Sequence, residues 1–139
     1  MTHGAPTPRA AAIIAEATAL LGVGFRLQGR SPAYGLDCIG LAALAARAGG
    51  FRGDVPADYT VRGGDAATLV ARFDASGLVR TDTPVPGDLA LFATGPAQFH
   101  LVVLVAGGII HADAGLRRVV ARPGTPPWPL LGCWRVEGA

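Results

Sequence analysis

The residues that follow Pro86-Gly87 set the strongest limit on the fold, because they form a succession of short strand-like runs. Phe99–Val105 (Phe-His-Leu-Val-Val-Leu-Val) is apolar and rich in β-branched residues, which is typical of a strand. Gly107-Gly108 then predicts a tight hairpin turn. The expected strands are Asp88–Phe92, Phe99–Val105, Ile109–Ala112, Arg117–Arg122 and Leu130–Val136. We therefore predict an antiparallel sheet of about five strands.

The first half of the chain carries helical patterns instead. Arg9–Leu21 is rich in alanine and repeats its larger apolar residues at helical spacing. Leu41–Ala48 is rich in strong helix formers and is followed by a glycine pair, which predicts a helix from Cys38 to about Ala48. Asp65 can cap a short helix that ends at Phe73. The segments expected to be loops or turns are Gly22–Pro32, Phe51–Gly64 and Thr81–Gly87. This order of elements predicts one α+β domain over residues 1–139, with residues 1–8 as a flexible arm.

The composition excludes several classes of protein. Half of the 139 residues are hydrophobic and 16% are charged, so we expect a globular chain with one core. The formal net charge of +2 comes without a basic run, so we expect no nucleic-acid partner. Ala10–Leu21 is apolar but is interrupted by Glu16, is too short to span a bilayer and lacks the pattern of a signal peptide. We therefore expect synthesis in the cytoplasm and no membrane span.

Cys38 lies where a loop turns into the second predicted helix, with Asp37 near the N-cap. In the first turn of a helix, backbone N–H groups and the helix dipole favour a thiolate and can lower the pKa of a thiol from about 8.5 to roughly 3.5–7.5. The alternative is that Cys38 is a small buried apolar residue, as free cysteines often are. The other cysteine, Cys133, lies on a predicted strand, and we expect it to be buried.

His100 and His111 are the histidines that could complete a site with Cys38. An antiparallel hairpin around Gly107-Gly108 brings both to the same end, within one strand spacing. A reactive thiolate needs a base, and the base needs a third group that holds its ring. The two histidines could instead be hydrogen-bonded structural residues. A zinc site with Cys38 is a further alternative, but the usual closely spaced ligand pairs are absent, so we expect no metal and no cofactor.

Four short motifs resemble those of one enzyme family. They are Asp37-Cys38-Ile39-Gly40-Leu41, Pro86-Gly87-Asp88-Leu89, His100-Leu101-Val102-Val103-Leu104-Val105 and Ile110-His111-Ala112. Their order and spacing, over roughly Gly22 to Arg122, are similar to those of the NlpC-like cell-wall cysteine peptidases. The resemblance implies a papain-like (NlpC-type) α+β fold, with N-terminal helices packed on the antiparallel sheet. It also implies that Cys38 is the nucleophile, that His100 is the base and that His111 orients the His100 imidazole.

The resemblance is incomplete near the nucleophile. Ile39 replaces the usual serine, and Phe25 stands where a tyrosine usually supplies a hydroxyl to the oxyanion hole. The hole would then depend on backbone N–H groups, including that of Cys38, or on a side chain such as that of Gln28. We expect Phe25, Gln28 and Asp37 on the substrate side of the site, although Asp37 could equally be a plain helix N-cap.

The resemblance implies a hydrolase that cuts peptide bonds in peptidoglycan stem peptides. The form Phe-Arg-Leu-Gln-Gly-Arg-x-Pro at residues 25–32 is similar to a branch encoded with the tail genes of phages and gene transfer agents. We therefore expect phage-like tail proteins as partners, incorporation into a virion-like tail, and action in the periplasm of a target cell. The alternatives are a catalytically vestigial structural tail-tip protein, which Phe25 and Ile39 favour, and an acyltransferase on the same fold.

Overall fold

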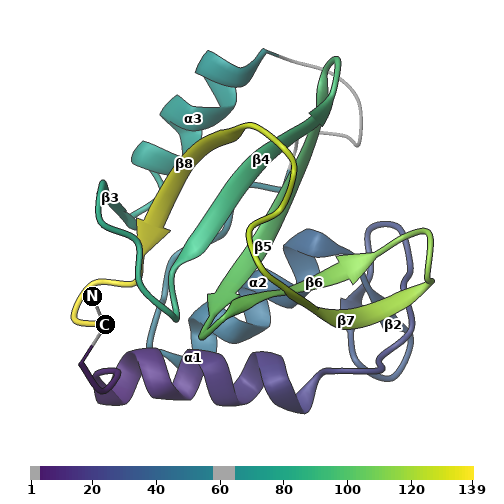
Figure 1. Cartoon of the computed structure of the whole chain (residues 1–139), viewed down its shortest axis with the longest axis horizontal. Helices are drawn as coiled ribbons and strands as arrows, with labels where there is room; N and C mark the ends of the chain where they lie inside the picture. Colours follow the sequence, from purple (N-terminus) through teal and green to yellow (C-terminus); the bar gives the residue numbers. More distant parts are fainter. Residues whose placement is uncertain (1–3, 58–64) are drawn as a thin grey trace.

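The computed structural model describes residues 4–57 and 65–139, which form three helices and two antiparallel sheets (Figure 1). The helices are α1 (Pro8–Ala19), α2 (Cys38–Ala48) and α3 (Ala66–Asp74). The small sheet pairs β1 (Arg30–Ser31) with β2 (Gly35–Leu36). The large sheet contains β3 (Val79–Thr81), β4 (Leu89–Gly95), β5 (Gln98–Val105), β6 (Gly108–Asp113), β7 (Arg118–Pro123) and β8 (Leu130–Arg135). The predicted α+β class is confirmed.

The large sheet has the strand order β3-β8-β4-β5-β6-β7, so the C-terminal strand lies inside the sheet. All five predicted strands are present, but β3 and the β1–β2 pair were not predicted. Thr81, which we expected to begin a turn, instead ends β3 and pairs with Cys133 of β8. Arg30 and Ser31, expected in a loop, pair with Leu36 and Gly35. Strands of two or three residues are too short to show a period-2 pattern, so the sequence could not reveal them.

Each helix begins at a side chain that accepts a hydrogen bond from the first turn. Asp37 accepts from the Gly40 N–H and Asp65 accepts from the Thr68 N–H, which confirms both predicted N-caps. Helix α1 begins at Pro8 instead of Arg9, because Thr7 is the cap and a proline costs no hydrogen bond at the first helical position.

The expected arm over residues 1–8 is wrong at Pro8, which belongs to α1, and residues 1–3 lie outside the described residues. Phe51–Gly64 was expected to be a loop. Residues 51–57 of this segment contain no helix or strand, and residues 58–64 lie outside the described part of the chain.

The turn between β5 and β6 is one residue earlier than the predicted Gly107-Gly108 pair. Val105 pairs directly with Gly108, so Ala106 and Gly107 form a two-residue turn. Gly107 has a φ of 76°, a backbone conformation that glycine adopts without a steric cost. The register then continues to Val103 opposite Ile110.

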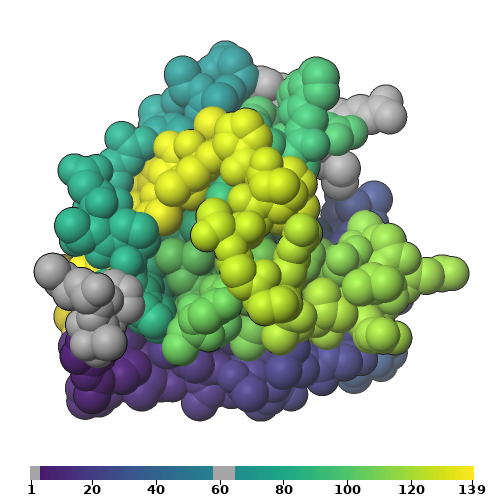
Figure 2. Space-filling model, viewed as in Figure 1, coloured from purple at the N-terminus to yellow at the C-terminus, as the bar shows by residue number. Residues whose placement is uncertain are grey.

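The two faces of the large sheet bury different sets of side chains. On β5, Leu101 and Val103 point into the main core, which also contains buried residues of α1, α2 and α3. Val102 faces the other side and belongs to a smaller cluster, against which Trp128 packs. Trp128 lies in the segment between β7 and β8, which crosses the front of the sheet as a yellow-green to yellow band in Figures 1 and 2. Trp134 is fully buried in the main core.

Within residues 4–57 and 65–139, no helix has the length and apolar character needed to cross a membrane.

Candidate active site

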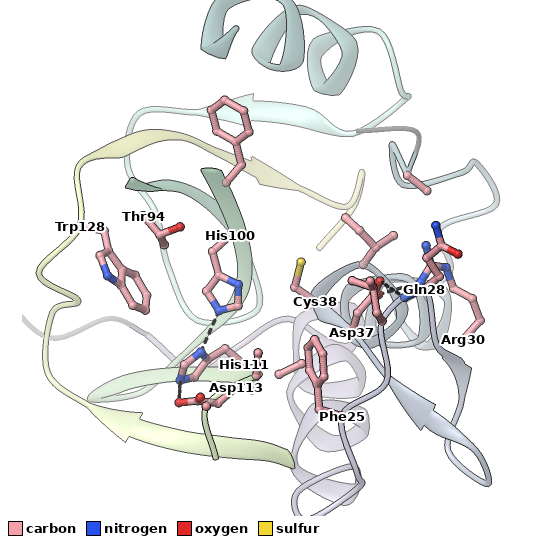
Figure 3. Close-up of a pocket in the computed structure, with 17 residues that line it drawn as sticks. Phe25, Gln28, Arg30, Asp37, Cys38, Thr94, His100, His111, Asp113 and Trp128 are labelled. Atoms are coloured by element: carbon pink, nitrogen blue, oxygen red, sulfur yellow. Dashed lines mark hydrogen bonds and ion pairs between the residues drawn. The ribbon is translucent and has the colours of Figure 1, made fainter. Parts of the chain in front are cut away.

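A cavity of about 750 Å³ opens where β5 and β6 separate at the end of their hairpin (Figure 3). Their pairing ends at Val103 and Ile110, whereas β6 continues beside β7, with His111 opposite Val120. The cavity is lined by Phe25, Leu27, Gln28, Arg30, Asp37, Cys38, Ile39, Ala57, Thr94, Phe99, His100, His111, Ala112, Asp113, Ala114, Gly115 and Trp128. All six residues predicted for the site from the sequence therefore line one cavity.

Cys38 is the first residue of α2 and is partly exposed. In Figure 3 its sulfur projects from the start of the helix toward the side of the cavity that holds His100. This position gives a thiolate the benefit of the positive end of the helix dipole. Cys133 contrasts with it, because that thiol is buried and its burial, together with the nearby Asp88, raises its pKa to about 11. The two thiols therefore differ in access, and burial makes the Cys133 thiol hard to ionise.

Asp37 holds the loop before the helix against the first helical turn. Its Oδ1 accepts hydrogen bonds from the Gly40 N–H (2.8 Å) and from Arg30 Nη1 (2.7 Å), and its Oδ2 accepts one from the Gln28 N–H (2.9 Å). Three donors thus neutralise and orient this buried carboxylate. Asp37 is the helix cap that the sequence suggested, and it also fixes Gln28 and Arg30 in the cavity wall.

His100 and His111 are joined directly by a hydrogen bond of 2.8 Å between His100 Nε2 and His111 Nδ1. His100 lies on β5 and His111 on β6, and their ring planes are nearly perpendicular. The bond uses Nε2 of His100, so Nδ1 is the nitrogen of that ring left to act on another group. The predicted meeting of the two histidines at the open end of the hairpin is confirmed.

Burial keeps both imidazoles neutral at physiological pH. Burial and, to a smaller extent, the nearby His111 lower the pKa of His100 to about 4, with the Asp113 carboxylate opposing both effects. Burial also lowers the pKa of His111, where Asp113 again raises the value and Arg122 lowers it. A neutral His100 has a lone pair with which to accept a proton, as a general base requires.

Trp128 closes the outer side of the histidine pair, a role that the sequence did not reveal. Its ring meets His100 edge-on at 5.5 Å between centroids and lies 6.1 Å from His111. Arg122 covers the indole at 5.4 Å from the ring centroid. Trp128 packs on the smaller cluster and also forms a wall of the cavity. The indole excludes water from the histidines, which contributes to the desolvation that lowers their pKa values.

The predicted substrate-side residues occupy the opposite wall. Phe25 pairs with Leu36 in an isolated bridge, and it lines the cavity together with the buried Ile39. Gln28 has a φ of 61°, an uncommon conformation for a residue other than glycine. Its N–H bond to Asp37 holds it there. A strained backbone at a cavity wall is a frequent property of functional residues.

Among the residues that the structure describes, no group of three or more His, Cys, Asp or Glu side chains is arranged to hold a metal ion.

A scan against protein-family models finds no match, and neither does a search of curated proteins. Solved structures match along nearly the whole chain. NlpC1 from Trichomonas vaginalis has a TM-score of 0.67 and 22% identity over 98% of this chain, which spans 46% of that larger chain.

Two mycobacterial structures connect the architecture to peptidoglycan. RipB from Mycobacterium tuberculosis, described as a peptidoglycan hydrolase, has a TM-score of 0.62 and 19% identity over 98% of this chain and 74% of its own. RipD from the same organism, described as a non-catalytic NlpC/p60 domain protein adapted to peptidoglycan binding, has a TM-score of 0.63 and 18% identity over 94% and 99% of the two chains. The chain therefore has the NlpC/P60 fold, which occurs in peptidoglycan hydrolases and in a non-catalytic relative.

Proposed function

We propose that the protein is a cysteine peptidase that hydrolyses peptide bonds in peptidoglycan stem peptides. The observation that carries the proposal is the shared cavity of Cys38, at the start of a helix, and the hydrogen-bonded pair His100–His111. This set supplies a nucleophile, a base and a group that orients the base. Its position on an NlpC/P60 fold directs the proposal to cell-wall peptides.

The chemistry follows from the two ring nitrogens of His100. Nδ1 accepts the proton of the Cys38 thiol, and Sγ attacks the carbonyl carbon of the scissile amide to form a tetrahedral intermediate. Protonated His100 then gives its proton to the leaving amine, so the amide bond breaks and a thioester to Cys38 remains. Nδ1 next accepts a proton from water, whose oxygen attacks the thioester and releases the acid product and the thiol.

The oxyanion of the intermediate needs donors that do not come from a tyrosine, because Phe25 has no hydroxyl. Cys38 begins α2 and lines the cavity together with Gln28, so the Cys38 backbone N–H and the Gln28 side-chain amide are the candidate donors. We assign the oxyanion hole to these groups. Ile39 leaves the wall apolar beside the sulfur, which strengthens charge interactions there.

Arg30 offers donors for an acidic group of a peptide, beside the carboxylates of Asp37 and Asp113 that line the same cavity. The walls of the cavity are largely apolar, and Arg30 places a guanidinium among them. Within the described residues, both Arg30 hydrogen bonds, to the Gly29 carbonyl and to Asp37, use Nη1, so the rest of the fork can meet a substrate carboxylate. A stem peptide cut next to its D-Glu residue presents such a group.

We also propose that the protein reaches peptidoglycan as part of a phage-like tail, in the periplasm of a target cell. The support is the form of residues 25–32 and its similarity to the tail-encoded branch. Purified particles should contain the protein, detectable by mass spectrometry, and its absence from them would remove this part of the proposal.

A second candidate function is peptidoglycan binding without cleavage. Phe25 and Ile39 favour it, because each removes a hydroxyl that the family pattern places at the site, and RipD shows that the fold supports such a role. An acyltransferase would use the same Cys38 thioester but pass the acyl group to an amine in place of water. Digestion of purified peptidoglycan separates these three functions.

We expect purified sacculi treated with the reduced protein to release fragments that carry new amino termini within the stem peptide. Mass spectrometry of the soluble fraction detects these termini, and Cys38→Ala, with its fold checked by circular dichroism, is the matched control. Co-sedimentation without fragment release would favour the binding function, and transfer of a peptide to an added amine would favour the acyltransferase. Fragments cleaved only in the glycan strands would refute peptidase activity.

A further inference from the structure

The histidine pair can form its hydrogen bond in two ways, and only one leaves His100 ready to act as a base. In the first, His100 Nε2–H donates to the lone pair of His111 Nδ1, so His100 Nδ1 is free of a proton. In the second, His111 Nδ1–H donates to His100 Nε2, so His100 carries its own proton on Nδ1. A neutral imidazole has one donor and one acceptor nitrogen, so the proton position on His111 determines which arrangement exists.

Asp113 faces the nitrogen that decides between them. His111 Nε2 lies 3.9 Å from Asp113 Oδ2, and His111 itself is almost fully buried. The other carboxylate oxygen, Oδ1, accepts a hydrogen bond of 2.9 Å from the Leu116 N–H, which fixes the carboxylate at the end of β6. Figure 3 shows the three groups in a row, from Asp113 through His111 to His100.

The carboxylate stabilises the productive arrangement. When Nε2 of His111 carries the proton, that N–H faces a negative oxygen, whereas the alternative tautomer places a lone pair there. The same charge also stabilises an imidazolium, which matters because burial lowers the pKa of both rings. The other charged or titratable groups near the pair are Arg118, opposite Asp113 on β7, Arg122, also on β7, and Cys38 on α2. Asp113 therefore places a negative charge close to the two rings, which opposes the positive charges of Arg118 and Arg122 on β7.

We propose that Asp113 is a positioning residue that holds the proton of His111 on Nε2 and thereby keeps His100 Nδ1 open toward Cys38. The inference rests on the proposed thiol chemistry and extends the catalytic set to a fourth member. Asp113 lies just beyond the NlpC-like motifs of the sequence, the last of which ends at Ala112.

Asp113→Asn is a sharp test, because it preserves the shape of the turn and removes the charge. The amide oxygen can keep the Leu116 bond, so the NH2 group then replaces Oδ2 and faces His111 Nε2. That NH2 favours a lone pair on Nε2 and shifts the proton to Nδ1. ¹⁵N NMR of the histidine rings should therefore show His111 protonated on Nε2 in the wild-type protein and on Nδ1 in the variant. The same tautomer in both proteins would overturn the proposal.

Activity provides a second, independent readout. We expect Asp113→Asn to lower kcat/KM for a soluble stem peptide by about 10–100-fold, as loss of an orienting partner of a functional histidine does. The limb of the pH profile that reports the imidazole should move to lower pH, because removing a negative charge lowers an imidazole pKa. Asp82→Asn, at an exposed position that does not line the cavity, is the control and should leave both quantities unchanged.

A double-mutant cycle separates positioning from support of the turn. The glutamine introduced by His111→Gln has no ring tautomer, so Asp113→Asn should have little further effect in that background. An equal loss in both backgrounds would show that Asp113 only maintains the turn, and would overturn the proposal. If the wild-type protein cuts no stem peptide, the proposed function fails, while the ring NMR still decides the assignment of Asp113.

Discussion

Replacing His100 with alanine is expected to reduce kcat/KM for stem-peptide cleavage by at least about 10²–10⁴-fold, the usual contribution of a general base. The reason is structural, because His100 and His111 are the described histidines and Nε2 of His100 is already bonded to His111. Only His100 can then exchange a proton with Cys38 through Nδ1. Initial rates on a soluble stem peptide measure the effect.

Variants of His111 provide the matched comparison. His111→Gln can still accept a hydrogen bond from the His100 ring and should retain more activity than His111→Leu, which cannot. Circular dichroism and thermal unfolding would check that each variant folds. A His100→Ala protein with near wild-type rates, or a fully active His111→Leu protein, would show that the pair is only structural.

Replacing Gly40 with alanine is expected to damage both stability and activity, although alanine is the better helix former. A Cβ on Gly40 would lie 2.2 Å from the Gly29 carbonyl oxygen, which belongs to the loop pressed against the first turn of α2. The loop must move away, and this disturbs the Asp37 bonds to Gln28 and Arg30. We expect the free energy of unfolding to fall by about 1–3 kcal/mol, the usual cost of overpacking. Chemical denaturation and peptide cleavage rates measure the two effects.

Gly24→Ala is the control for that experiment. Gly24 lies in the same part of the chain, but a Cβ there meets no atom within 4 Å, and its φ is not in the left-handed region. It should therefore change neither stability nor activity by much. Equal behaviour of the two variants would mean that the contact between Gly29 and α2 does not organise the site.

The central parts of the site could be predicted because local sequence determines them. A helix start is encoded by its cap and its helix formers, so Asp37 and Cys38 could be placed in advance. A glycine turn and two apolar strands set the hairpin register to within one residue, which was sufficient to bring His100 and His111 together. These features depend on neighbours in the chain, which a pattern can show.

The remaining parts depend on contacts between distant segments. Trp128 reaches the histidines because the segment between β7 and β8 crosses the front of the sheet, and no periodic pattern predicts that path (Figure 2). Arg30 joins the site through the Asp37 carboxylate, and Asp113 joins it through a turn that follows β6. An alternation of polar and apolar residues after His111 could have drawn attention to Asp113, since positions two apart share a face of a strand.

The central claim is that the Cys38 sulfur attacks a stem-peptide carbonyl, and trapping of the thioester tests it most directly. The reduced protein would be mixed with a soluble stem peptide, quenched in acid within the first turnover and analysed by intact mass and peptide mapping. We predict a mass increase equal to the acyl half of the substrate, located on Cys38 and absent from Cys38→Ala. Cleavage of the peptide by Cys38→Ala, or turnover that iodoacetamide does not stop, would contradict the account.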